Sequence, residues 1–262
     1  MTTFWSGMSR PSPGDELWCR RFHPADNPAA RLVCLPHAGG SASYYLPVSA
    51  ALSPDVDVLA IQYPGRQDRR MEQPIDDLTV LVDRLYEVLR RQPELPLTFL
   101  GHSMGAVIGF ELTRRLEADG HGPVRLFASG RRAPSTYREE NTFRSDDAIL
   151  AEVRRLSGTA SALLGDEEMM RAALPALRAD YTAVEGYRCA PEVTVDCPIT
   201  VLTGDNDPKT TLDEAKAWAG HTTGSFDLRV FNGGHFFISD RSKEVMQVLV
   251  EHFQDERART AG

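Results

Sequence analysis

The amino-acid sequence predicts an α/β fold with a mostly parallel central sheet and helices on both faces. Short apolar runs of strand character alternate with longer helical patterns through the first half of the chain, and several of the runs end in loops rich in glycine or proline. This alternation is typical of parallel strands joined by right-handed helical crossovers. The length of 262 residues and the hydrophobic content of 42% suffice for one large α/β domain or two small ones.

The amino-terminal part supplies the first strands and a glycine-bearing loop. Residues 1–15 contain proline, glycine, serine and threonine with little periodicity, so we expect a flexible leader. Strands are expected at residues 16–22 and 31–36, and a helix at about 43–53. Between them, residues 37–40 (HAGG) form a loop whose free backbone N–H groups can face an anion.

The middle of the chain continues the alternation. Strands are expected at residues 56–63, 97–100 and 124–129. The helix over residues 75–92 is predicted by apolar residues at helical spacing, namely Leu78, Val82, Leu85 and Leu89. This apolar face is interpreted as packing against the sheet.

After residue 134 the alternation stops for almost sixty residues. Residues 135–192 contain helical patterns around 146–156, 166–177 and 177–187, and no convincing strand. We expect a helical lid inserted into a core made of residues 16–134 and 193–262. Further packing helices are the alternative. The core then resumes with strands at 199–203 and 226–231 and with helices at about 212–219 and 239–253.

One serine lies between two glycines where a strand gives way to a helix. Residues 101–105 read GHSMG, and a helical pattern of Val107, Ile108, Leu112 and Leu116 follows at once. This context predicts a nucleophile elbow, a sharp turn that lifts the hydroxyl of Ser103 clear of the sheet. Side chains at Gly101 and Gly105 would collide with the neighbouring strand or helix. The positive end of the helix would lie beside a developing oxyanion.

A nucleophilic serine needs a base and a group that orients this base. Among seven histidines, His235 is the one that lies in a glycine-bearing loop directly after a late strand. His102 adjoins the serine, but neighbouring side chains point apart in such a turn. For the acid, Asp207 is favoured over Asp205, because its spacing from Gly204 places the carboxylate past the turn. The order Ser, Asp, His is that of an α/β-hydrolase.

Composition excludes several other functions. The net charge of −8 argues against nucleic acid as a general partner, and no apolar run approaches the roughly 20 residues of a membrane helix. Residues 37–40 fit neither phosphate-loop spacing, and no His-rich pattern predicts a metal site or a cofactor. Four scattered cysteines are too few to stabilise a chain of this length through disulfide bonds, and Cys34 and Cys197 are expected in the core. Without a secretion signal, the cytoplasm is the expected location.

The ordered motifs resemble those of type II thioesterases of modular polyketide and nonribosomal peptide synthesis. They cover nearly the whole chain after the leader, and they are PHAGGSASYY (36–45), QYPGR (62–66), GHSMGA (101–106), SGRRAP (129–134), TGDNDP (203–208) and GGHFF (233–237). The resemblance implies an α/β-hydrolase fold and a discrete editing enzyme. Such an enzyme hydrolyses stalled or unwanted acyl groups from the phosphopantetheine arm of acyl or peptidyl carrier proteins.

The same resemblance implies roles for individual residues. Ser103 would be the nucleophile, His235 the base and Asp207 the orienting acid, with the N–H groups of Ala38 and Met104 as the oxyanion hole. Within the lid, flexible apolar side chains suit an acyl channel, and Leu164, Met169 and Met170 are the candidates. A monomer is expected.

The expected chemistry is hydrolysis of a thioester through an acyl-serine. Thioesters suit this site better than peptides do, because a thiolate leaves more readily than an amine. A carboxylesterase or an acyltransferase could use the same Ser-His-Asp triad. A non-catalytic binding module on the same fold is a further alternative, which the complete triad disfavours.

Overall fold

The chain folds around a seven-stranded sheet with the order β1-β3-β2-β4-β5-β6-β7. The computed structural model describes residues 14–157 and 167–260. Strand β1 pairs with β3 in the antiparallel direction, and every other neighbouring pair is parallel, as the sequence predicts. The strands are β1 (Cys19–Arg20), β2 (Ala30–Leu35), β3 (Val56–Ile61), β4 (Leu97–His102), β5 (Arg125–Ser129), β6 (Ile199–Gly204) and β7 (Phe226–Phe231).

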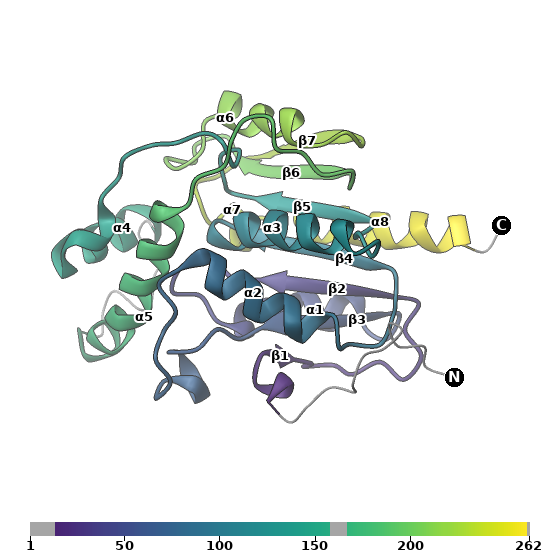
Figure 1. Cartoon of the computed structure of the whole chain (residues 1–262), viewed down its shortest axis with the longest axis horizontal. Coiled ribbons are helices and arrows are strands. Elements are labelled where there is room, and N and C mark those ends of the chain that lie inside the picture. The colour runs from purple at the N-terminus through teal and green to yellow at the C-terminus, as the bar shows by residue number, and fades with distance from the viewer. Residues whose placement is uncertain (1–13, 158–166, 261–262) are drawn as a thin grey trace.

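Helices cover both faces of the sheet (Figure 1). Helices α2 and α3 lie on one face, and α1 and α8 lie on the other. The α-helices are α1 (Leu46–Leu52), α2 (Leu78–Leu89), α3 (Met104–Ala118), α4 (Asp146–Ser157), α5 (Glu167–Gly186), α6 (Leu212–Lys216), α7 (Phe237–Asp240) and α8 (Ser242–Thr260). The short 3-10 helices are η1 (Asp15–Leu17), η2 (Ala42–Tyr45), η3 (Gln67–Arg69), η4 (Thr142–Arg144) and η6 (Ala217–His221).

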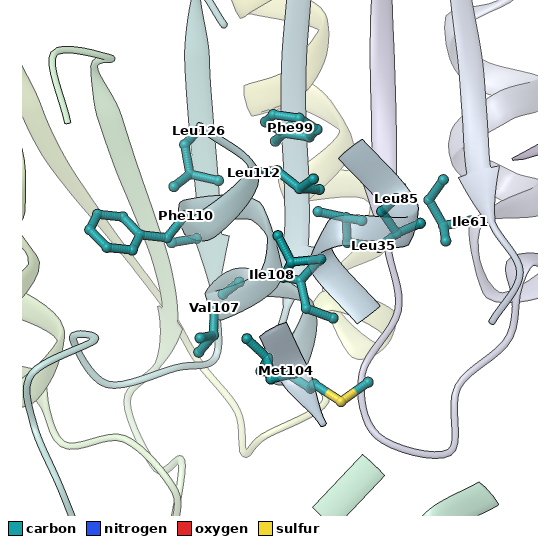
Figure 2. Close-up of a cluster of buried hydrophobic side chains, with 14 of the residues drawn as sticks. Leu35, Ile61, Leu85, Phe99, Met104, Val107, Ile108, Phe110, Leu112 and Leu126 are labelled. Carbon is teal, nitrogen blue, oxygen red and sulfur yellow. The ribbon is translucent and has the colours of Figure 1, made fainter. Parts of the chain in front are cut away.

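The alternation of side chains along each strand divides the core into two clusters. Val33 and Leu35 of β2 pack toward α2 and α3, while Leu32 and Cys34 pack toward α1 and α8. Figure 2 shows the first cluster, in which strand residues such as Phe99 meet the apolar side chains of α3. Strands buried on both faces read as continuous apolar runs, which explains why the sequence reveals them so clearly.

Three predicted elements differ from the structure. The strand expected at residues 16–22 is reduced to the two paired residues of β1, and Asp15–Leu17 form a 3-10 turn instead. This edge segment has one partner strand, and Arg21 leaves the ladder to form an ion pair with Asp57. The helices expected at 166–177 and 177–187 are one helix, α5, which continues through Pro175.

Helices α4 and α5 lie beyond the carboxyl ends of the parallel strands (Figure 1). They occupy most of the segment predicted as a lid, where the part that the structure describes contains no strand. Loops after parallel strands gather at this edge of an α/β sheet, and ligands bind there. Within the same described residues, no helix has the length and apolar character needed to cross a membrane. Cys34 and Cys197 are buried in the core, as predicted.

Candidate active site

Ser103 occupies a strained turn between β4 and α3. Its φ of 54° and ψ of −113° are rare for a residue with a side chain, and its backbone N–H donates to Ser129 O at 2.7 Å. The glycines on either side have no room for a side chain. A Cβ at Gly101 would lie 2.1 Å from Gly105 O, and one at Gly105 would lie 2.0 Å from Leu35 O. The predicted steric reason for both glycines is therefore confirmed.

His235 and Asp207 are paired although they come from two different loops. Nδ1 of His235 lies 3.0 Å from both carboxylate oxygens of Asp207, and both side chains are buried. Asp207 follows β6, and His235 follows β7, the next strand of the sheet. The backbone N–H of Lys209 also donates to Asp207 Oδ1 at 2.8 Å, which fixes the carboxylate. With Nδ1 bound to the acid, Nε2 is the nitrogen left for a proton transfer.

The competing residues are engaged elsewhere. Asp205 is exposed and stabilises the turn, because its Oδ1 accepts hydrogen bonds from Gly233 N at 2.9 Å and from the side chain of Asn206 at 2.8 Å. Hydrogen bonds, led by the one from Gly233, lower the pKa of Asp205. The ring of His102 is fully buried, and its Nδ1 lies 2.9 Å from Ser129 Oγ. Burial holds the pKa of His102 well below its usual range, so the ring stays neutral.

The loop after β2 leaves the backbone N–H of Ala38 without an acceptor among the described residues. Gly39 N–H donates to Asp180 Oδ2 at 2.7 Å, and Gly40 N–H donates to His37 O at 2.8 Å. Among the described residues, no acceptor is bound to Ala38 N–H. Met104 is the first residue of α3, where a backbone N–H has no partner within the helix. Both groups expected to form an oxyanion hole are thus available.

A small pocket of about 20 Å³ brings these residues together. Its lining includes Ser103, His235, Ala38 and His37, the charged residues Arg131, Glu140 and Lys209, and also Leu156 of α4 and Tyr181 and Val184 of α5. This volume holds about one water molecule, so an acyl chain requires the lining side chains to move. Burial lowers the pKa of His37 to about 3, which keeps the ring of His37 neutral.

Cavity size alone would not have identified the site. A larger hollow of about 380 Å³ lies beside Arg31 and Leu97, at the amino ends of β2 and β4. It is at the opposite end of these strands from Ser103. The assignment of the site therefore rests on the reactive side chains and on their geometry.

The three predicted acyl-binding residues have different outcomes. Leu164 lies outside the described residues, and so does the side chain of Met169. Met170 is buried, but it is not among the described residues that line the pocket of Ser103, to which this segment contributes Glu140, Leu156, Tyr181 and Val184. The role of the methionines remains a prediction.

Sequence reasoning missed the charged residues that join the lid segment to the catalytic loops. Asp180 of α5 contacts Gly39 and forms a buried ion pair with Arg66. Lys209, two residues after Asp207, binds Glu152 of α4 at 2.8 Å and also contacts Glu140. One signal was present: Asp180 follows Leu177 by three residues and precedes Val184 by four, so a carboxylate lies on the apolar face of its helix.

No group of three or more His, Cys, Asp or Glu side chains is arranged to hold a metal ion anywhere in residues 14–157 and 167–260.

Comparison with known proteins identifies the family. The thioesterase domain model matches residues 30–254. A probable cadicidin biosynthesis thioesterase of Streptomyces griseus is 53% identical over 93% of this chain and 68% of its own length. Thioesterase PikA5 of Streptomyces venezuelae is 48% identical over 90% of this chain and 85% of its own length.

Solved structures agree with this result. The type II thioesterase BorB from the borrelidin biosynthetic cluster superimposes with a TM-score of 0.86, at 48% identity over 90% of this chain and 97% of BorB. YbtT, a type II thioesterase from the yersiniabactin pathway, gives a TM-score of 0.80 at 31% identity, over 91% of this chain and 98% of YbtT.

The fold and the site thus define a thioester hydrolase of the α/β-hydrolase class. The chain belongs to the thioesterase family, and its resemblance to the type II thioesterases of polyketide and nonribosomal peptide synthesis is confirmed.

Proposed function

We propose that this thioesterase releases acyl groups from the phosphopantetheine arm of carrier proteins through an acyl-serine intermediate. The observation that carries the proposal is the buried pair of His235 and Asp207 in the same pocket as Ser103 on its strained turn. In this arrangement Ser103 is the nucleophile, His235 is the general base, and Asp207 holds the imidazole in the tautomer that can accept a proton.

Acylation transfers one proton and exchanges one bond. His235 Nε2 takes the hydroxyl proton while Ser103 Oγ attacks the thioester carbonyl carbon, and the carbonyl electron pair moves onto the oxygen. The N–H groups of Ala38 and Met104 stabilise this oxyanion. When the carbonyl re-forms, the C–S bond breaks, and the imidazolium gives its proton to the sulfur of the departing thiol.

Deacylation repeats these steps with water. His235 removes a proton from the water molecule, which attacks the acyl-serine and forms a second oxyanion in the same place. Collapse breaks the bond to Ser103 Oγ, and the proton returns to the serine. The products are a free carboxylic acid, a carrier protein with a free thiol, and the original enzyme.

The names of the relatives support a carrier protein as the partner. BorB belongs to the borrelidin biosynthetic cluster, and YbtT belongs to a pathway of nonribosomal peptide and polyketide synthesis. A discrete thioesterase in such a pathway acts on acyl groups attached to carrier proteins. We assign to this chain the removal of stalled or unwanted acyl groups, with residues 135–192 as the wall that selects them.

The test is mass spectrometry of a panel of acyl carrier proteins incubated with the enzyme in ¹⁸O-labelled water. The proposal requires loss of the acyl mass from the carrier and one ¹⁸O in the released acid. Transfer of the acyl group to another acceptor would indicate an acyltransferase. Cleavage of simple esters without release from carriers would indicate a carboxylesterase.

Ser103→Ala is the matched control for this experiment. It should lose at least about 10³-fold in rate while keeping the thermal stability of the wild type, because the elbow backbone is unchanged. A variant that keeps about a tenth of the activity or more would exclude Ser103 as the nucleophile. Labelling of the wild type by a fluorophosphonate would exclude a non-catalytic binding module.

A further inference from the structure

The carboxylate of Asp180 connects helix α5 directly to the loop that carries Ala38. Its Oδ2 accepts the backbone N–H of Gly39 at 2.7 Å, and the guanidinium of Arg66 binds the same oxygen. Asp180 is 1% exposed and Arg66 is 7% exposed. The three residues lie far apart in the sequence, so the fold alone brings them together.

Stability alone does not explain why an ion pair is buried here. Removing two charges from water costs several kcal/mol per ion, and apolar side chains of similar size often stabilise such a position equally well. Here the pair is directed at the backbone N–H of Gly39, which it binds at 2.7 Å. Arg66 also donates to Pro64 O, so its own loop holds it in place while it binds Asp180.

The loop at residues 37–40 is held in place at Gly39 by its own turn and by helix α5. Gly39 has a φ of 76°, and the hydrogen bond from Gly40 N–H to His37 O closes the turn. A Cβ at Gly39 would lie 2.4 Å from Leu177 Cδ2, so α5 packs directly against the glycine. With the peptide of Gly39 fixed by Asp180, the neighbouring peptide that carries Ala38 N–H has a fixed orientation.

We propose that Asp180 is a positioning residue for the oxyanion hole, an inference that rests on the proposed function. An oxyanion donor must lie 2.7–3.1 Å from the oxyanion, and an error of 1 Å can cost about 100-fold in rate. Helix α5 therefore affects the reaction rate, through the position of an oxyanion donor, as well as the shape of the acyl site. Arg66 has a second effect, since its positive charge offsets the repulsion between the Asp180 carboxylate and an oxyanion.

The test compares substitutions of two carboxylates on the same helix. Asp180→Leu removes the acceptor for Gly39 N–H, whereas Asp180→Asn keeps an oxygen that can accept it. Glu185→Leu is the matched control, because Glu185 also lies on α5 and accepts a backbone N–H, that of Thr142 at 3.0 Å, away from the oxyanion loop. Asp180→Ala is the second variant if Asp180→Leu fails to fold.

Three measurements separate positioning from a general structural role. These are kcat and KM for an acyl-pantetheine thioester, the inhibition constant of a trifluoromethyl ketone thioether that binds as a hemiketal oxyanion, and the rate of fluorophosphonate labelling of Ser103. For Asp180→Leu or Asp180→Ala we expect kcat, inhibitor affinity and labelling rate to fall together by about 10- to 100-fold, with KM changed less than threefold. Asp180→Asn should recover most of this loss, and Glu185→Leu should show none of it.

The inference is overturned if folded Asp180→Leu or Asp180→Ala keeps the wild-type kcat and labelling rate, if KM alone changes, or if Glu185→Leu gives the same losses. Failure of the proposed function is a different result, namely a wild-type enzyme that releases no acyl group from carrier proteins. The labelling rate and the inhibition constant still decide the role of Asp180 in that case, because neither needs the carrier substrate.

Discussion

Asp207 and Asp205 lie two residues apart in one loop, yet only Asp207 reaches His235. Nδ1 of His235 lies 3.0 Å from each oxygen of Asp207, while Asp205 bonds to Gly233 and Asn232. We expect Asp207→Asn to lower kcat by about 10⁴-fold, because an amide permits the wrong tautomer of His235. Asp205→Asn should lower it by less than tenfold. Steady-state kinetics on an acyl-pantetheine thioester distinguishes the two, and the reverse ranking would assign the acid role to Asp205.

The elbow glycines should tolerate no side chain. In Gly101→Ala and Gly105→Ala the new Cβ would lie 2.1 Å and 2.0 Å from backbone oxygens, which cannot move without displacing α3 or β2. We expect each variant to lose at least about 3 kcal/mol of unfolding free energy in urea, the upper range for overpacking.

Gly220→Ala is the control for these variants, because a Cβ there meets no atom within 4 Å. It should stay within about 0.5 kcal/mol of the wild type. Equal stability of Gly101→Ala and Gly220→Ala would show that the turn can relax.

The wall of the pocket should decide which acyl chains fit. Val184 and Leu156 line the pocket that holds Ser103, so Val184→Ala should raise the ratio of kcat/KM for long over short acyl thioesters by about tenfold. A small activated ester, which reports the triad alone, should react at nearly the wild-type rate. Met170→Ala tests the hypothesis from the sequence that the methionines of the lid bind the acyl chain. If Met170→Ala shifts the ratio and Val184→Ala does not, the methionines form the acyl site.

Stability should depend on pH through His252 of α8, which contacts Thr98 of β4 and Phe127 of β5. Burial, together with the charge of Arg125, lowers the pKa of His252 from 6.5 to about 4, and its Nε2 lies 2.9 Å from Thr98 Oγ1. The unfolded chain then binds a proton more readily than the folded chain does. This contribution to stability is therefore present above pH 6.5 and is lost as the pH falls toward 4.

Urea unfolding between pH 7 and pH 4.5 measures this effect. The unfolding free energy of the wild type should fall with pH, and that of His252→Gln should fall less steeply, because glutamine does not titrate and can still bond to Thr98. Parallel curves for the two proteins would mean that other groups cause the acid sensitivity.

The sequence predicts those parts of the molecule that local chemistry determines. The buried strands are readable because their side chains are apolar on both faces, and GHSMG is readable because the turn permits few residue types. The segment at residues 16–22 is harder to predict. It lies at the edge of the sheet, so its length as a strand depends on how far it pairs with its single neighbour, β3.

The contacts between the lid segment and the catalytic loops could not be predicted in the same way. Asp180 and Gly39 are 141 positions apart, and Lys209 and Glu152 are 57 apart. No spacing rule connects such residues, because their meeting depends on how α4 and α5 are placed over the sheet. A charged residue on an apolar helix face indicates a buried partner, but it does not say which one.

Pro175 lies inside α5, and the part of the helix after it contacts the loop at Gly39 through Asp180. A proline inside a helix cannot donate to the carbonyl four residues earlier, here that of Arg171, and its ring crowds that turn. The hydrogen-bonded ladder of α5 therefore lacks the bond between Pro175 and Arg171. Leu177 and Asp180, which contact Gly39, lie after Pro175, and so do the pocket residues Tyr181 and Val184. A shift of α5 before Pro175 can therefore leave both the contact at Gly39 and the wall of the pocket in place.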